Sequence, residues 1–406
     1  MGEPPPATSL NPASSTAPAL QHYSRVLGRY EGQQPGPLVL CVGGIHGNEP
    51  AGIHALQQVF EILQSTQPKM RGTLVGLSGN IRALEVGTRF IDHDLNRAWK
   101  PSRMETLESL NDGCAETLEQ RELLATIRTM VRGQRGPFYF LDLHTSSAEG
   151  EPFACIGDTI RNRKFAQSFP VPVILGLEEQ LEGALLEHLN NAGMITMGFE
   201  AGQHRATSSV SNHAAAIWRA LVGARCLRES ECPQARDAAK LLETSRNGLP
   251  RWLGVRYRHA ITEADGFQMR PGYRNFRPLQ PHEIVADDQI AGGIRANYKS
   301  RMILPLYQGK GDDGFFLALE IHPAWLATSR WMRRLRFDRA IHLLPGVRRI
   351  RGGHGQEALH VDRRIARWFL VEIFHLLGFR KRRIHGDHFL VERRKFDLKG
   401  PPHLEL

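Results

Sequence analysis

The sequence contains few cysteines, and their arrangement excludes two classes of protein. There are five among 406 residues, an odd number, and no two form a C-x-x-C pair. A disulfide-stabilised scaffold needs paired cysteines, and a thiolate zinc site needs them closely spaced. We therefore expect reduced thiols and a cytoplasmic protein. The five are Cys41, Cys114, Cys155, Cys226 and Cys232.

Long apolar runs are also missing. A membrane-spanning helix needs ~20 consecutive apolar residues, and the longest candidate, Phe369–Phe379, is interrupted by Glu372 and His375. The N-terminal segment has neither the cationic start nor the apolar core of a secretory signal. It is rich in Pro, Ser, Thr and Ala, a composition typical of disorder. We predict a disordered lead over residues 1–21.

Excess positive charge is absent from most of the chain. The formal net charge is +10, yet residues 331–406 alone carry 18 basic and 8 acidic residues, so the first 330 residues are balanced. The basic character is thus a property of the C-terminal segment.

The first 250 residues alternate strand-like and helix-like patterns, which predicts an α/β fold with a mixed sheet covered by helices. We assign residues 22–250 to this α/β domain. The expected strands are Pro37–Gly43, Gly72–Leu77, Phe138–Leu143, Phe153–Ile156, Val171–Leu177 and Met194–Phe199. The expected helices are Glu49–Gln64, Cys114–Arg132, Gln180–Asn190 and Val210–Leu227.

Beyond residue 250 the pattern changes. Short strand-like pieces separated by Gly, Pro and Asp predict a small β-rich domain over residues 251–329. These pieces are Gly254–Tyr257, Glu283–Ala286, Met302–Leu306 and Gly314–Glu320. Residues 330–406 form a basic α+β accessory segment with one amphipathic stretch, Ile365–Leu377.

Two motifs carry metal-binding residue types at the ends of buried strands. GGIHGNEP places His46 and Glu49 three residues apart at a glycine-rich strand-to-helix turn, and DLHTSS places His144 where another strand ends. Two histidines and a glutamate with one open position are the ligand set of a catalytic zinc site. Asp142 can orient one of the two imidazoles. The alternative is that His46 and Glu49 cap a helix and His144 is a hydrogen-bonded core residue.

A second His-x-x-Glu pattern acts as an internal control. His354 and Glu357, extended by His360, follow no apolar strand and lie among arginines. The strand, turn and helix context is therefore what distinguishes His46 and Glu49.

Four motifs in order resemble a known family. GGIHGNEP, TRFIDHDLNRAW (88–99), DLHTSS and GFEAGQH (198–204) are similar to the succinylglutamate desuccinylase/aspartoacylase family, relatives of the zinc carboxypeptidases, over about residues 36–320. The resemblance implies a three-layer zinc-carboxypeptidase-like domain and hydrolysis of an amide in an N-acyl amino acid. By the same resemblance one Zn²⁺ is held by His46, Glu49 and His144, with Glu200 as general base and acid. The resemblance further implies that Arg89 stabilises the oxyanion formed during hydrolysis, and that Asn96 and Arg97 bind the substrate carboxylate.

The residue types agree with these roles. Zinc lowers the pKa of bound water and polarises a carbonyl. Glu200 follows an apolar strand, so partial burial and a raised pKa are expected of it, as suits a proton carrier. Arginine binds a carboxylate through two charge-assisted hydrogen bonds. The alternatives are a buried Glu200 paired with an arginine, and an ion-pair network of Arg89 and Arg97 with Asp92 and Asp94.

The sequence departs from the family pattern in two places. The family carries an arginine about ten residues before the catalytic glutamate, but residues 178–199 contain no Lys or Arg and do contain several glutamates. A family tyrosine falls on Phe315 or Phe316. We therefore predict a substrate with one carboxylate and a neutral or cationic remainder, unless His204 or Arg205 replaces the missing arginine.

Three classes of function remain open. The first is a zinc deacylase that binds a small carboxylate substrate, and the second is a carboxypeptidase-like hydrolase of peptides or cell-wall fragments. The third is a non-catalytic scaffold whose basic segment binds nucleic acid or a membrane surface. For residues 331–406 we favour a folded accessory unit that packs on the body or mediates a homo-oligomer.

Overall fold

The computed structural model describes residues 22–290, 292–308, 310–351, 357–362, 365, 370–385 and 388–406. The predicted lead at 1–21 and His354 lie outside these residues, as does part of the stretch 365–377. Within the described part, no helix combines the length and apolarity that crossing a membrane requires.

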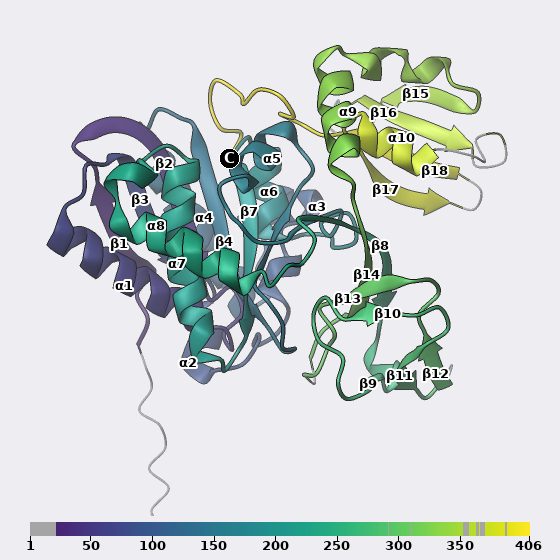
Figure 1. The fold of residues 1–406 in the computed structure, drawn as a ribbon, viewed down its shortest axis with the longest axis horizontal. Coiled ribbons are helices and arrows are strands. Elements are labelled where there is room, and N and C mark those ends of the chain that lie inside the picture. The colour runs from purple at the N-terminus through teal and green to yellow at the C-terminus, as the bar shows by residue number, and fades with distance from the viewer. Residues whose placement is uncertain are drawn as a thin grey trace, which may run out of the picture.

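One large mixed sheet organises the molecule (Figure 1). Its strand order is β1-β3-β2-β4-β7-β5-β6-β8-β14-β13-β10. The strands are β1 (Val26–Glu31), β2 (Gln34–Gly43), β3 (Arg71–Ser78), β4 (Phe138–Ser146), β5 (Phe153–Ile156), β6 (Val173–Leu175), β7 (Ile195–Gln203), β8 (Trp252–Ala260), β10 (Pro278–Leu279), β13 (Ser300–Ile303) and β14 (Asp313–Glu320).

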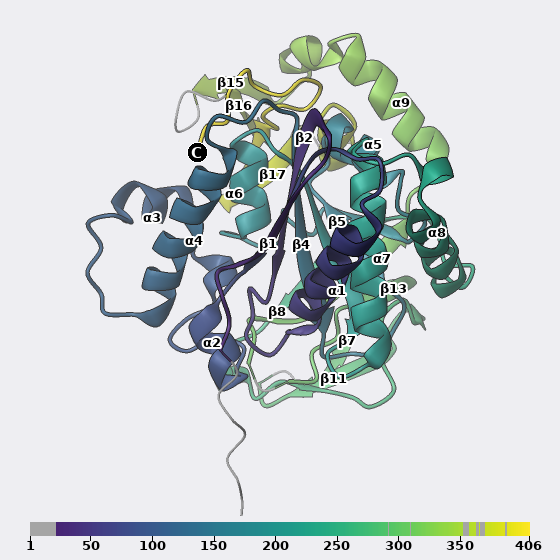
Figure 2. The same cartoon turned by 90° about the vertical axis from the view of Figure 1, so that its left-hand side faces the viewer.

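Helices cover both faces of this sheet, so the predicted three-layer α/β fold is confirmed (Figure 2). Helices α1, α7 and α8 lie on one side, and α3, α4 and α6 on the other. The helices are α1 (Ala51–Thr66), α2 (Ile81–Val86), α3 (Pro101–Thr106), α4 (Ala115–Val131), α5 (Ile160–Ala166), α6 (Leu185–Asn191), α7 (Thr207–Gly223) and α8 (Pro233–Ser245), with short 3₁₀ turns at Leu95–Arg97, Glu229–Glu231 and Glu263–Asp265.

Strand β2 explains why two layers of helices are needed. Val39 and Cys41 join the apolar core on the α1 and α7 side, whereas Leu38, Leu40 and Val42 join the core on the α4 side. Successive side chains of a strand point to opposite faces. A continuous apolar strand therefore has to be buried on both faces, as in parallel sheets generally.

The sheet continues past residue 250. Strand β8 pairs in parallel with β6, and β14 pairs with β8. A small separate sheet of β9 (Gln268–Met269), β11 (Ile284–Asp288) and β12 (Gly292–Arg295) lies beyond it. The C-terminal segment contains α9 (Pro323–Arg334), a 3₁₀ turn (Phe337–Leu343), β15 (Val347–Arg351), β16 (Glu357–Asp362), α10 (Leu370–Leu376), β17 (Phe379–His385) and β18 (His388–Arg393).

One predicted helix starts too early. Its pattern indicated Gln180–Asn190, but α6 begins at Leu185. Gly183 has a positive φ of 79°, a conformation that ends regular helix, and the Leu185 N–H donates to Asn96 Oδ1 at 2.9 Å. A contact from 89 residues away therefore fixes the start of the helix.

Candidate metal centre

Three parallel strands bring the predicted ligands to one edge of the sheet. Strands β2, β4 and β7 are adjacent and parallel, and His144 on β4 is in register with Glu200 on β7. His46 and Glu49 lie in the turn between β2 and α1. Because the carboxyl ends of these strands coincide, all four side chains reach the same place, as expected for α/β sheets.

The ligand atoms of His46, Glu49 and His144 all lie within 4.8 Å of one another. His46 Nδ1 is 2.9 Å from Glu49 Oε1, and His144 Nδ1 is 3.3 Å from Glu49 Oε2. Burial alone would raise the pKa of Glu49, but the two imidazoles hold it well below its usual range. The glutamate is thus presented as an anion between two histidines.

The far nitrogen of each imidazole contacts an aspartate. His46 Nε2 lies 3.1 Å from Asp94 Oδ1, and His144 Nε2 lies 3.0 Å from Asp142 Oδ2. An acceptor on one ring nitrogen directs the other toward a metal and raises its basicity. The sequence left open which histidine Asp142 serves, and it is His144. The partner of His46 is Asp94, a role that the sequence did not indicate.

This arrangement fits a divalent ion. The three side chains are two imidazoles and an ionised carboxylate, and their converging atoms have aspartate support behind both rings. Such a donor set suits Zn²⁺ and several other transition metals. It leaves room in the coordination sphere for water or substrate.

Glu200 sits beside this cluster, inside β7 and not just beyond its end. Burial raises its pKa to about 8, partly opposed by His144. Its Oε2 has no hydrogen-bond partner among the described residues. A carboxyl group with a pKa near neutrality can both take up and release a proton.

Arg89 and Arg97 occupy different positions. Arg89 donates to Asp94 Oδ2 at 3.0 Å and lies 3.7 Å from Glu49 Oε1, next to the ligand cluster. Arg97 donates to Asp313 Oδ2 at 2.8 Å, across the pocket on β14. Each arginine therefore has a carboxylate partner, and a substrate carboxylate would have to share Arg97 with Asp313.

A small pocket of about 160 Å³ opens at the cluster. All seven predicted site residues line it, and Asn96 is buried. The remaining wall is largely apolar: it includes Leu177, Leu181, Leu186 and Phe316. Phe316, and not Phe315, is therefore the aromatic residue at the pocket.

Of the two residues proposed to replace the missing arginine, His204 lines the pocket and Arg205 is exposed. His204 Nδ1 contacts Thr145 Oγ1 at 2.8 Å, and burial lowers its pKa. A histidine with a lowered pKa is a poor substitute for a permanent positive charge.

Comparison with known proteins agrees with this architecture. Residues 35–224 match the succinylglutamate desuccinylase/aspartoacylase catalytic domain. This part of the chain is a member of the succinylglutamate desuccinylase/aspartoacylase family, as its motifs indicated.

Curated relatives include the succinylglutamate desuccinylases of Pseudoalteromonas atlantica and Pseudomonas paraeruginosa. The first is 28% identical over 119 residues, 29% of this chain and 34% of that protein. The second is 33% identical over 108 residues, 27% of this chain and 31% of that protein. The matched segments thus span about a third of these relatives.

Solved structures share the fold. A succinylglutamate desuccinylase/aspartoacylase from Rhodobacter sphaeroides gives a TM-score of 0.51 at 16% identity, covering 72% of this chain and 88% of that one. The Vibrio cholerae succinylglutamate desuccinylase gives 0.50 at 15% identity, covering 71% and 83%.

Proposed function

We propose that this protein is a zinc-dependent deacylase that hydrolyses the amide bond of a small N-acyl amino acid. The observation that carries the proposal is the convergence of His46, Glu49 and His144 in one pocket with Glu200. Amide hydrolysis needs an activated water molecule and a group that transfers protons. Three residues that can hold a metal ion, beside a carboxyl group that can be protonated, can meet both needs. Membership of the deacylase family supports the same reaction.

His46, Glu49 and His144 would hold the ion. When bound, the ion would polarise the scissile carbonyl and lower the pKa of a water molecule. Glu200 then accepts a proton from the attacking water and delivers it to the leaving amine, because its raised pKa suits both steps. Arg89, 3.7 Å from Glu49, supplies positive charge where the carbonyl oxygen becomes anionic.

Asn96 and Arg97 are the proposed carboxylate clamp. Arg97 already donates to one carboxylate, that of Asp313, and a substrate carboxylate would share its guanidinium group. The pocket volume of about 160 Å³ favours a small molecule. Its apolar wall and its acids, Glu178 among them, favour a substrate with one carboxylate and a neutral or cationic remainder.

The test is a panel of N-acyl amino acids offered to metal-free and zinc-loaded protein, with amino acid release as the readout. We expect release only from the loaded protein, and none from a loaded His46→Ala variant. Peptides form a second arm, because preferential release of a C-terminal residue would favour a carboxypeptidase. A loaded protein that releases nothing in either arm would contradict the proposal.

A further inference from the structure

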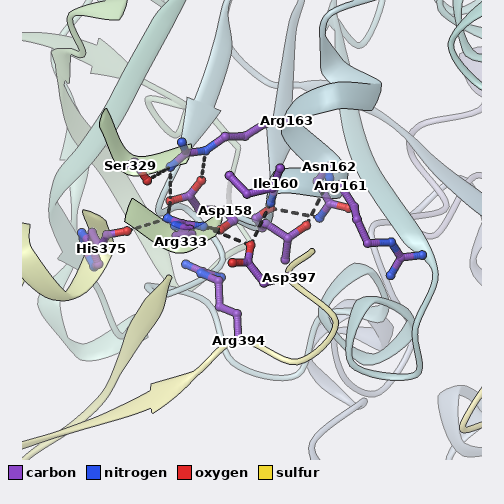
Figure 3. Close-up of polar contacts among 12 residues, drawn as sticks. Asp158, Ile160, Arg161, Asn162, Arg163, Ser329, Arg333, His375, Arg394 and Asp397 are labelled. Atoms are coloured by element: carbon purple, nitrogen blue, oxygen red, sulfur yellow. Dashed lines mark hydrogen bonds and ion pairs between the residues drawn. The ribbon is translucent and has the colours of Figure 1, made fainter. Parts of the chain in front are cut away.

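The C-terminal segment is anchored to the catalytic body through a buried arginine. Arg333 of α9 is 1% exposed, with Nη2 lying 2.8 Å from Asp158 Oδ2 and Nη1 lying 3.1 Å from Asp397 Oδ1. Asp158 follows β5 of the body and also binds Arg163 (Figure 3). Arg333 additionally donates to the Leu376 carbonyl at 3.0 Å. One side chain thus joins the body to α9, α10 and the chain beyond β18.

A second arginine of this segment reaches the loop between β6 and α6. Arg394, just after β18, has a side chain only 3% exposed, and its Nη2 lies 2.7 Å from Glu178 Oε1. The same nitrogen donates a hydrogen bond to Glu179 Oε1. His375 Nε2 lies 2.8 Å from Glu179 Oε2. The C-terminal segment therefore contacts two consecutive residues of this loop, Glu178 and Glu179.

The same loop forms a wall of the candidate active site. Leu177, Glu178 and Leu181 all line the pocket. Cys155, which also lines it, has a raised pKa because of burial and then because of Glu200 and Glu178. Glu178 and Glu200, the proposed general base, therefore both influence the same pocket residue, Cys155.

Glu178 is a buried carboxyl group in the pocket wall. Its side chain is 7% exposed, and neither carboxylate oxygen has a hydrogen-bond partner among the described residues. Arg394 Nη2 forms an ion pair with Glu178 Oε1. Burial raises the pKa of Glu178, and Arg394 opposes that shift without cancelling it, so the arginine favours the ionised form against the effect of burial. An ionised carboxylate only accepts hydrogen bonds.

We propose that Arg394 is a positioning residue that holds Glu178 in the pocket wall, and that Glu178 selects substrates whose remainder donates a hydrogen bond. A second substrate carboxylate would meet like charge there and would be rejected. A site built to bind a donor discriminates strongly against an analogue that lacks it. The inference rests on the proposed deacylase activity and gives the C-terminal segment a part in its specificity.

Two matched pairs of substrates test the role of Glu178. N-acetylasparagine and N-acetylaspartate have the same shape and differ in an amide against a carboxylate, as do N-acetylglutamine and N-acetylglutamate. We expect the zinc-loaded wild type to prefer the amide at least tenfold in kcat/KM. Glu178→Gln, which preserves shape, should lower that preference at least tenfold.

Substitution of Arg394 tests positioning. Arg394→Met should raise KM for the amide about tenfold with little change in kcat, and Arg394→Lys should restore part of the loss. Arg393→Met is the matched control, because Arg393 is adjacent but lies 3.0 Å from Asp338 within the C-terminal segment. Its KM should stay at the wild-type value. Thermal unfolding of each variant separates positioning from loss of fold.

The outcomes separate the two proposals. A wild type that prefers the diacid, or a Glu178→Gln variant with unchanged preference, overturns the role of Glu178. An Arg394→Met variant that changes only Tm overturns the positioning role. If the wild type cleaves other N-acyl amino acids but none of these four, the inference is wrong and the deacylase proposal stands. If it cleaves no N-acyl amino acid, the deacylase proposal is wrong and the inference falls with it.

Discussion

Asp94 and Asp142 give the two candidate ligand histidines a defined orientation. Each contacts Nε2 of one imidazole at 3.0–3.1 Å, which turns Nδ1 of both rings toward Glu49. Asp94 also binds Arg89 and the Asn96 backbone N–H. A single aspartate thus connects a candidate metal ligand, the residue proposed for the oxyanion and the proposed clamp.

Replacing Asp142 should weaken metal binding without removing a ligand. For Asp142→Asn we expect zinc affinity to fall about 10- to 100-fold, because His144 loses a charged partner that raises its basicity. Competition with a chromogenic chelator measures the change. Asp237→Asn, at an exposed position on α8, is the control and should bind zinc like the wild type. Equal affinity in both variants would remove the supporting role of Asp142.

The proposed acid–base role of Glu200 can be distinguished from the role of the three proposed metal ligands by its effect on kcat. Glu200→Gln should lower kcat by about 10²- to 10⁴-fold, the usual contribution of a general acid–base group. Zinc content should stay at the wild-type level, because Glu200 is not one of the three proposed ligands. Steady-state kinetics together with metal analysis give the answer. A variant with normal kcat, or one without zinc, would argue against the proposed role.

At the scale of helices and strands, the sequence predicted those elements whose positions are determined by local patterns of apolar residues. The buried strands around β2, β3, β4 and β5 are continuous apolar runs, and α1 repeats apolar residues at helical spacing, so their positions were foreseen. The trio His46, Glu49 and His144 was foreseen because each residue lies at or just beyond the end of such an apolar run. The start of α6 was not, since a side chain from the segment after α2 determines it.

Contacts between residues far apart in the sequence account for the features that were not predicted. Asp94 as the partner of His46, Asp313 as the partner of Arg97, and Arg394 as the partner of Glu178 join residues 48, 216 and more than 200 positions apart. Local periodicity carries no information about such pairs. The sequence showed the positive charge of the C-terminal segment, but it did not show which acidic residues this charge pairs with.

The anchoring of α9 and α5 to Asp158 should be sensitive to acid. Arg163 and Arg333 overcome burial and hold the pKa of Asp158 well below its usual 3.8. A carboxyl group with a lowered folded-state pKa stabilises the fold above its unfolded pKa, and that stability is lost as pH falls through the folded value. We therefore expect the free energy of unfolding to decline below about pH 4.

Asp158→Asn should remove most of this contribution at neutral pH. The loss of one partner from a buried ion pair costs about 3–5 kcal/mol. Denaturant titrations at pH 7 and at lower pH measure it, and the variant should show a shallower acid decline than the wild type. Asp237→Asn serves again as the exposed control. A neutral-pH loss as small as that of the control would contradict the anchoring role.

At the scale of the whole molecule, the proposed ion would tie together separate parts of the chain. His46 and Glu49 belong to the turn after β2, and His144 to β4, about 100 residues later. A ligand that binds only the folded state stabilises it by about 2.7 kcal/mol at 100 times its Kd. Removal of the metal should therefore destabilise the entire fold and not only the site.

Thermal unfolding with and without a chelator checks this expectation. The wild type should lose a few degrees of Tm when stripped and recover them when zinc is restored. His46→Ala should show the same Tm in both conditions. An unchanged wild-type Tm would mean that the trio binds no ion tightly.

Strands β7, β5, β6, β8 and β14 are consecutive neighbours in one sheet, which joins the two walls of the pocket through backbone hydrogen bonds. Asp313 and Phe316 on β14 line the same pocket as the candidate metal ligands and belong to the same sheet, so the two walls cannot swing apart about a hinge without breaking backbone pairing. Molecules have to enter and leave by side-chain motion and by movement of short loops. We therefore expect molecular size to limit which of the proposed substrates can enter the pocket.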